Sequence, residues 1–197
     1  MKPEEWIQLM ETTGRLKDMT RHSWTRGGRQ ESVADHSFHM ASMAYFVQNR
    51  FPEADMKKIY EMCMLHDMGE AFTGDIPAFE KTKDHEAREK EQIRRWVDSL
   101  PEAYREKTRA LFEEMEALET PEARIVKALD KLEAVIQHNE ADLSTWLELE
   151  YELNQVYGAE YTKFDDFLES VRRQAAADTR KKLAQAGVCT EEEGREV

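Results

Sequence analysis

Apolar residues recur every three to four positions along most of this chain, a spacing typical of α-helices that bury one face. For example, His36, Met40, Met43 and Val47 follow one another at this spacing. The 197 residues include only 8 Gly and 5 Pro, and we see no clean alternation of apolar and polar residues that would predict a strand. We therefore predict an all-α fold, a bundle of helices packed through their apolar faces.

Breaks in the periodicity divide the chain into helices. The first is predicted at about residues 2–18, with Ile7, Met10 and Leu16 facing inward. Thr120 and Pro121 have the residue types expected at the N-cap and first position of a later helix. Other helices are predicted at about residues 33–50 and 53–68, in the charged segment from residue 80 to about 100, after Pro101, and twice before Gly187.

The length suits one domain, which we place at residues 1–188, followed by an acidic, flexible tail at 189–197. The formal net charge of −13 argues against a nucleic-acid polymer or an anionic membrane as the main partner. No apolar run approaches the roughly 20 residues of a membrane span, and the first residues lack an apolar signal core. The two cysteines, Cys63 and Cys189, make no disulfide framework, so we expect a cytoplasmic protein.

Three predicted helices each carry ionisable residues on an apolar face: His36, the adjacent pair His66-Asp67, and Asp130. Each alone has an ordinary explanation, such as a hydrogen-bonded core histidine or a helix cap. Together they supply two imidazoles and two carboxylates, a set that suits one divalent transition metal such as Co, Mn, Fe, Ni or Zn. The chain lacks a set of thiolate ligands for a structural zinc site.

Two further carboxylates, Glu70 and Asp75, follow the His66-Asp67 pair closely. Either could hold an attacking water or protonate a leaving alkoxide beside a metal. Glu70 could equally be a surface or capping acid, and Asp75 a turn residue beside Gly74.

A positively charged segment precedes His36 and is expected to form a loop at residues 20–31. Arg21, Arg26 and Arg29 could pair with phosphate, and Trp24 could stack on a base or ribose. Trp24 could instead be a core aromatic, and Arg26 and Arg29 could be solvated. Lys81 could also reach a phosphate, although a solvated lysine is the simpler interpretation.

The longer motifs around these residues resemble the HD-domain metal-dependent phosphohydrolases, and most closely their 5′-deoxynucleotidase branch. They are ESVADHS at residues 31–37, HDMGEAFTGDIP at residues 66–77 and LDKLEA at residues 129–134. The resemblance covers about residues 16–136. It implies a helical bundle with a single buried metal site and hydrolysis of deoxyribonucleoside 5′-monophosphates to deoxynucleoside and phosphate.

The resemblance also implies roles for individual residues. His36, His66, Asp67 and Asp130 would hold the metal, Glu70 and Asp75 would assist the chemistry, and Arg21 and Trp24 would contact the nucleotide. It further implies a homodimer. We expect a water positioned by Asp75 to attack phosphorus in line, with Glu70 orienting a water or the leaving oxygen.

Other functions remain open at this stage. One class comprises hydrolases of a dNTP, a cyclic dinucleotide or (p)ppGpp. The dinuclear phosphodiesterases need extra bridging histidines, and only His85 lies between His66-Asp67 and Asp130. The non-enzyme alternatives are a metal-stabilised, nucleotide-binding sensor and a helical scaffold whose site is vestigial.

Overall fold

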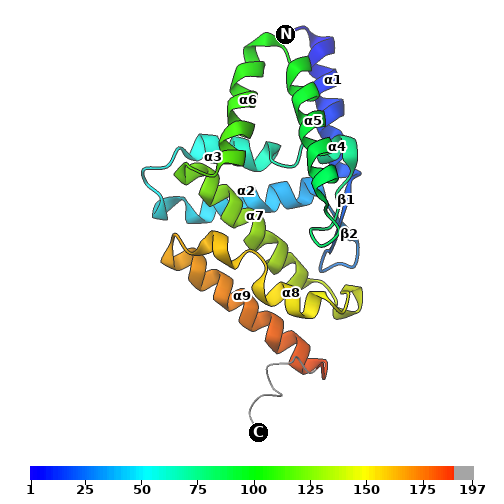
Figure 1. Ribbon diagram of the computed structural model, residues 1–197, viewed down its shortest axis with the longest axis vertical. Helices are drawn as coiled ribbons and strands as arrows, with labels where there is room; N and C mark the ends of the chain where they lie inside the picture. Colours follow the sequence, from blue (N-terminus) through cyan, green and yellow to red (C-terminus); the bar gives the residue numbers. More distant parts are fainter. Residues whose placement is uncertain (189–197) are drawn as a thin grey trace. The chain divides into compact units, whose positions relative to one another are not determined.

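Helices form nearly all of the regular structure in the computed structural model, which describes residues 1–188 (Figure 1). The predicted tail, residues 189–197, lies outside the described residues. The predicted all-α class is confirmed. Within the described part of the chain, no helix is both long enough and apolar enough to span a membrane.

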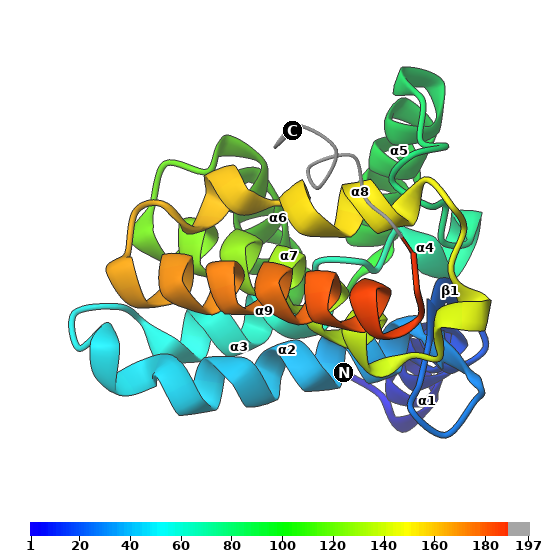
Figure 2. The same cartoon turned by 90° about the horizontal axis from the view of Figure 1, so that it is seen from below.

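The chain divides into two compact units, Met1–His22 with Glu31–Lys127, and Ser23–Gln30 with residues 128–188. That residues 1–188 form a single domain stays a prediction. The first unit contains α1 (Pro3–Gly14), η1 (Arg15–Lys17), α2 (Val33–Val47), η2 (Gln48–Arg50), α3 (Met56–Leu65), α4 (Glu70–Thr73), α5 (Lys83–Ser99), α6 (Glu102–Ala117) and the start of α7 (Pro121–Glu140). In it, α2 and α3 lie side by side (Figures 1 and 2).

The segment predicted as a loop at residues 20–31 is instead largely a β-hairpin. Its strands are β1 (Thr20–Trp24) and β2 (Gln30–Ser32), which pair in a two-stranded sheet. The turn is closed by two hydrogen bonds, from the Thr25 N–H to the Arg29 carbonyl at 2.8 Å and from the Gly28 N–H to the Thr25 carbonyl at 2.9 Å. Strands this short and polar leave little alternation to detect, which explains the wrong prediction.

Side-chain caps fix where two important helices begin. The Ser32 hydroxyl accepts a hydrogen bond from the Asp35 N–H at 3.1 Å, and the Asp35 carboxylate accepts one from the Ser32 N–H at 2.9 Å. This capping box starts α2 one turn before His36. At the start of α7, the Thr120 hydroxyl accepts a bond from the Ala123 N–H at 3.2 Å, so the predicted Thr120 cap is confirmed.

An apolar cluster in the first unit includes the two residues that flank Gly69 and Glu70. Met68 and Ala71 are buried in it, together with Leu16, Val33, Trp96, Val97 and Leu100. Leu16 therefore faces inward as predicted. Ile7 and Met10 do not, because 53% and 42% of these residues are exposed. Periodicity identifies an apolar face of a helix but not what covers it.

The second unit contains the rest of α7, η3 (Leu143–Thr145), α8 (Glu150–Val156), η4 (Ala159–Thr162) and α9 (Asp166–Gln185). Helices α8 and α9 lie side by side, as Figure 2 shows. Between them the Asn154 amide donates to the Thr179 hydroxyl at 2.9 Å, and that hydroxyl lies 2.8 Å from the Asn139 side-chain oxygen. These bonds satisfy polar groups buried between helices.

Gly158 lies between α8 and η4 and is expected to tolerate no side chain. Its φ is +71°, and an added Cβ would lie 2.4 Å from Cβ of Lys131. Gly158→Ala should therefore combine the cost of a left-handed backbone with a collision. We expect a loss of about 1–3 kcal/mol of stability, measured as a lower midpoint in urea unfolding.

Gly187→Ala is the matched control for this substitution. Gly187 has a φ of +72°, but an added Cβ would meet nothing within 4 Å. The control should lose only the backbone contribution, about 1 kcal/mol. Equal losses in the two variants would show that the contact with Lys131 does not matter.

Candidate metal centre and active site

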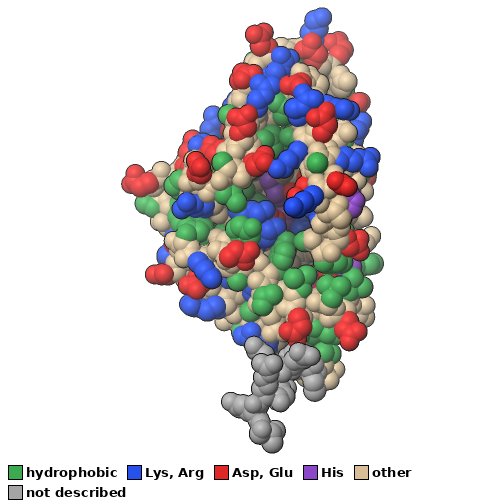
Figure 3. Space-filling model, viewed as in Figure 1, with side chains coloured by type: hydrophobic (Ala, Val, Ile, Leu, Met, Phe, Trp, Pro, Cys, Tyr) green, Lys and Arg blue, Asp and Glu red, His purple; other side chains and the backbone are tan. Residues whose placement is uncertain are grey.

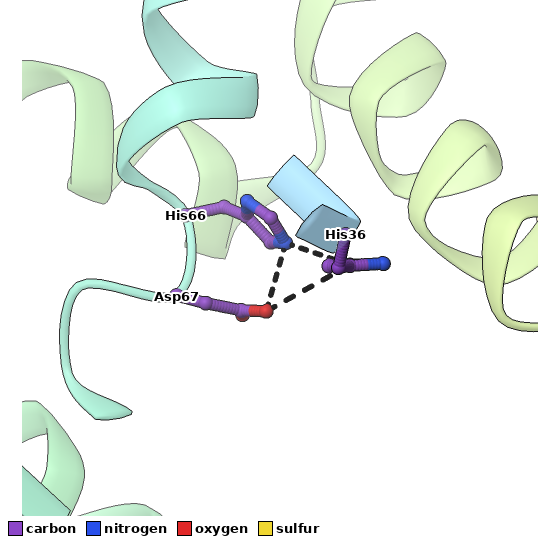
Figure 4. A group of neighbouring side chains, drawn as sticks. All are labelled: His36, His66 and Asp67. Atoms are coloured by element: carbon purple, nitrogen blue, oxygen red, sulfur yellow. Dashed lines mark hydrogen bonds and ion pairs between the residues drawn. The ribbon is translucent and has the colours of Figure 1, made fainter. Parts of the chain in front are cut away.

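Three predicted ligand residues of the first unit converge on one point (Figure 4). Nε2 of His66 lies 3.2 Å from Nε2 of His36 and 3.0 Å from Oδ2 of Asp67. Nε2 of His36 lies 3.8 Å from the same carboxylate oxygen. Ligand atoms that lie about 3–4 Å apart can bind the same ion, since the distance from each ligand atom to a metal such as zinc is about 2.0–2.2 Å.

The hydrogen bonding of His66 shows that this group of atoms suits a cation. Nδ1 of His66 lies 3.0 Å from the Cys63 carbonyl. A carbonyl can only accept, so Nδ1 carries a proton, and in the neutral imidazole Nε2 presents a lone pair. Nε2 therefore faces the Asp67 oxygen as one acceptor facing another. A cation placed between two such acceptors would satisfy both, and the donor types fit a divalent transition metal.

The local fold places the three side chains as the sequence pattern predicted. His36 lies on the buried side of α2 and is 0% exposed. His66 is the C-cap of α3, where its N–H donates to the Met62 carbonyl at 2.8 Å. Asp67 follows directly, and the buried Met68 anchors the chain beyond it. The helix predicted at about residues 53–68 spans Met56–Leu65, and the His66-Asp67 pair follows its C-terminal end, as predicted.

Arg21 lies beside the triad and is held by two carboxylates. Its Nη1 lies 3.4 Å from Oδ2 of Asp67, and its Nε lies 3.1 Å from Oε2 of Glu31. Glu31 is 1% exposed. The sequence prediction missed Glu31, because an acid next to a helix cap is usually a surface residue. A predicted hairpin would have indicated its role, because pairing of β1 with β2 brings Arg21 next to Glu31.

Glu70 lies on the buried side of the short helix α4. It is 5% exposed, and its Oε2 has no hydrogen-bond partner within residues 1–188. Burial raises the pKa of Glu70 to about 10, with further contributions from the negative charges of Asp67 and Asp75, against the opposing charge of Arg21. A buried carboxyl group that holds its proton at neutral pH can act as a general acid.

Asp75 is partly exposed and follows Gly74, the C-cap of α4. Its charge contributes to the raised pKa of Glu70, so the two carboxyl groups belong to the same electrostatic neighbourhood. One acid is buried and the other is open to water.

The remaining predicted site residues belong to the second unit. Asp130 lies on α7, where its Oδ2 pairs with Nζ of Lys131 at 3.1 Å. Lys131 also donates to the Tyr157 hydroxyl at 2.8 Å. The Trp24 carbonyl accepts a hydrogen bond from the Gln137 side chain at 2.8 Å. The roles predicted for Asp130 and Trp24 stay predictions.

Comparison with known proteins gives a consistent result. The HD domain family model matches residues 13–172. A curated relative named 5′-deoxynucleotidase HDDC2 from Danio rerio is 34% identical over 141 residues, covering 70% of each protein. The protein of the same name from Homo sapiens is 34% identical over 138 residues, covering 68% of this chain and 67% of the human protein.

The fold also has a solved counterpart. A crystal structure described as a predicted metal-dependent phosphohydrolase from Magnetospirillum magnetotacticum superposes with a TM-score of 0.79. The match covers 95% of both chains at 22% sequence identity. At this identity the likeness supports the fold, which agrees with the predicted helical architecture.

Proposed function

This chain belongs to the HD domain family, and we propose that it hydrolyses deoxyribonucleoside 5′-monophosphates to deoxynucleoside and phosphate. The relatives named 5′-deoxynucleotidase support this substrate class. The observation that carries the proposal is the convergence of His36, His66 and Asp67. The buried Glu70 follows them closely, and its N–H donates to the Asp67 carbonyl at 3.0 Å. Metal ligands next to a protonated carboxyl group are the components that phosphomonoester hydrolysis needs.

We assign His36, His66 and Asp67 as ligands of one divalent ion of Co, Mn, Fe, Ni or Zn. The sequence adds Asp130 as a fourth ligand, which remains a prediction. When bound, such an ion supplies Lewis-acid stabilisation of negative charge on a phosphate oxygen. Arg21 lies beside Asp67 and offers a guanidinium to the same phosphate. Trp24 remains the predicted base or ribose contact.

The proton movements follow from the environments of the two acids. Asp75, open to water, holds the attacking water and accepts its proton as oxygen bonds to phosphorus. Glu70, buried and protonated, donates its proton to the 5′-oxygen as the phosphorus–oxygen bond breaks. The products are a neutral hydroxyl on the deoxynucleoside and inorganic phosphate.

A substrate panel tests the proposal. Metal-stripped protein reloaded with cobalt or manganese should release phosphate from deoxyribonucleoside 5′-monophosphates, and much less from the ribonucleotides. Activity confined to dNTP or (p)ppGpp would replace the proposed substrate with another nucleotide. Absence of turnover on every nucleotide would contradict the assignment as an enzyme and favour a nucleotide-binding role.

Two finer features remain predictions. The first is a homodimer. In the first unit, α1 exposes Trp6, Ile7 and Met10, and α2 exposes Phe38 and Phe46, apolar residues of the kind that self-association covers. Light scattering in solution should give the mass of two chains. The second is the cytoplasmic location, which rests on the cysteine usage described above.

A further inference from the structure

Lys81 is fixed in the loop between α4 and α5, close in sequence to Asp75. Its Nζ pairs with Oε2 of Glu89 on α5 at 2.6 Å, and 29% of the Lys81 side chain is exposed. Its backbone N–H donates to the Pro77 carbonyl at 3.0 Å. The ammonium group is therefore held by its backbone turn and by its carboxylate partner, yet it stays open to solvent.

Glu89 in turn packs closely on the chain of the candidate site. A Cβ added to Gly69 would lie 2.5 Å from Cγ of Glu89 and 3.1 Å from Cδ1 of Ile93. Only a residue without a side chain lets α5 approach the backbone here. Because Gly69 lies between Asp67 and Glu70 in sequence, this packing brings the partner of Lys81 against the segment that carries both residues.

The pKa of Lys81 also reflects the charges of the candidate site. Burial lowers the pKa of Lys81, but the hydrogen bond and charge of Glu89 raise it, and the charges of Glu70 and Asp67 raise it further, so that its pKa lies above the usual value. The ammonium group therefore lies in the field of two residues of the candidate site. The positive charge of Lys81 therefore interacts with two acidic residues of the candidate site.

A phosphate monoester needs such a charge. It carries roughly −1.5 to −2 at neutral pH, and it would have to approach the acidic Asp67 and Asp75. Asp67 and Glu31 both pair with Arg21 and offset part of its charge, so a second cation is needed to balance the phosphate. Over α5 and α6, basic and acidic side chains alternate on the face drawn in Figure 3, so the acidic surplus forms no continuous negative surface there.

We propose that Lys81 binds the phosphate group of the substrate, and that Glu89 is the residue that positions it. In the free protein, Lys81 pairs with Glu89. When a phosphate monoester enters, the ammonium group turns its other N–H donors to the phosphate oxygens, as a lysine can because its three donors rotate. This assignment rests on the proposed hydrolysis of nucleoside monophosphates and adds a residue for recognising their phosphate.

The test uses the metal-loaded protein and the variants Lys81→Met and Lys81→Arg. Methionine keeps an unbranched apolar stem and removes the charge. We expect Lys81→Met to raise KM for a deoxynucleoside monophosphate about 10-fold or more, with kcat nearly unchanged. The inhibition constant of inorganic phosphate should rise by the same factor. Lys81→Arg should retain most of the affinity for both, and it guards against a folding defect in the methionine variant.

Two further variants separate a specific contact from general charge. Lys83→Met removes an exposed lysine two residues away and should change neither constant. Glu89→Gln should raise both constants less than Lys81→Met does, and the double variant should be no worse than Lys81→Met alone. Additive effects in the double variant would overturn the positioning role of Glu89. Equal effects from Lys83→Met, or unchanged constants in Lys81→Met, would overturn the role of Lys81.

Binding of inorganic phosphate, measured as thermal stabilisation of the metal-loaded protein, keeps the two proposals separate. If no monophosphate is hydrolysed but Lys81→Met removes the stabilisation and Lys83→Met does not, the proposed reaction is wrong and the Lys81 contact stands. If monophosphates are hydrolysed and Lys81→Met is stabilised by phosphate like the unmodified protein, the reaction stands and the Lys81 contact is wrong.

Discussion

Asp67→Asn is expected to reduce kcat/KM by about 1,000-fold or more and to remove the bound metal in the same step. Metal ions contribute several kcal/mol to transition states of this kind, which corresponds to factors of this size. Asp67 supplies the carboxylate oxygen that lies within 3.8 Å of both histidine Nε2 atoms. An amide is a poor replacement for an anionic ligand.

The fold should survive this substitution. In the metal-free protein, the asparagine amide could donate to the lone pair of His66 Nε2, where aspartate presents only an acceptor. Arg21 would keep its ion pair with Glu31. The thermal midpoint without metal should therefore be equal to or above that of the unmodified protein. Asp178→Asn, at an exposed position on α9, is the matched control and should keep both metal and activity. A metal-free Asp67→Asn enzyme with full turnover would refute the scheme.

Glu70→Gln is expected to lower kcat by about 100- to 10,000-fold, the range typical of a lost general acid or base. KM should change little, because the amide keeps the shape of the carboxyl group. Glu113→Gln replaces an exposed glutamate of α6 and is the control. Unchanged turnover in Glu70→Gln would show that Glu70 has no role in the mechanism.

The same substitution should stabilise the metal-free protein at neutral and alkaline pH. The pKa of Glu70 is raised from 4.5 to about 10 by burial and by neighbouring negative charges. Between these two values the folded protein holds a proton that the unfolded chain has released. Stability is therefore lost as the pH rises above about 4.5, by up to about 1.4 kcal/mol per pH unit. Glutamine has no proton to lose and avoids this loss.

Thermal midpoints at several pH values measure this effect. Glu70→Gln should melt several degrees above the unmodified protein at pH 8, and the two should converge near pH 4. A constant difference across the pH range would show that Glu70 is not the group responsible. Lower activity together with higher stability is the behaviour expected of a residue retained for function.

Local patterns were sufficient to predict where the candidate ligand residues of the first unit lie. The helical spacing of His36 and Met40 involves only neighbours in sequence, so the buried position of His36 could be predicted. The end of the helix before His66 could be placed to within a few residues for the same reason. Such signals depend on intrahelical geometry and do not require the tertiary fold.

Features that depend on tertiary contacts could not be predicted. The pairing of Arg21 with Glu31 requires the hairpin, and the hairpin strands are too short and polar to show alternation. The close approach of Glu89 to Gly69 cannot be predicted from the sequence, in which a glycine at this position indicates only a break in the helix. The exposure of Ile7 was missed because an apolar face carries no information about what covers it.

The most direct test of the central claim is a metal titration of the stripped protein, with bound metal and release of phosphate from a deoxynucleoside monophosphate measured in the same samples. Turnover should be absent without metal, rise in proportion to bound manganese or cobalt, and reach its maximum at one ion per chain. Full turnover in the stripped protein, or one bound ion per chain without turnover on any monophosphate, would contradict the proposed metal-dependent hydrolysis.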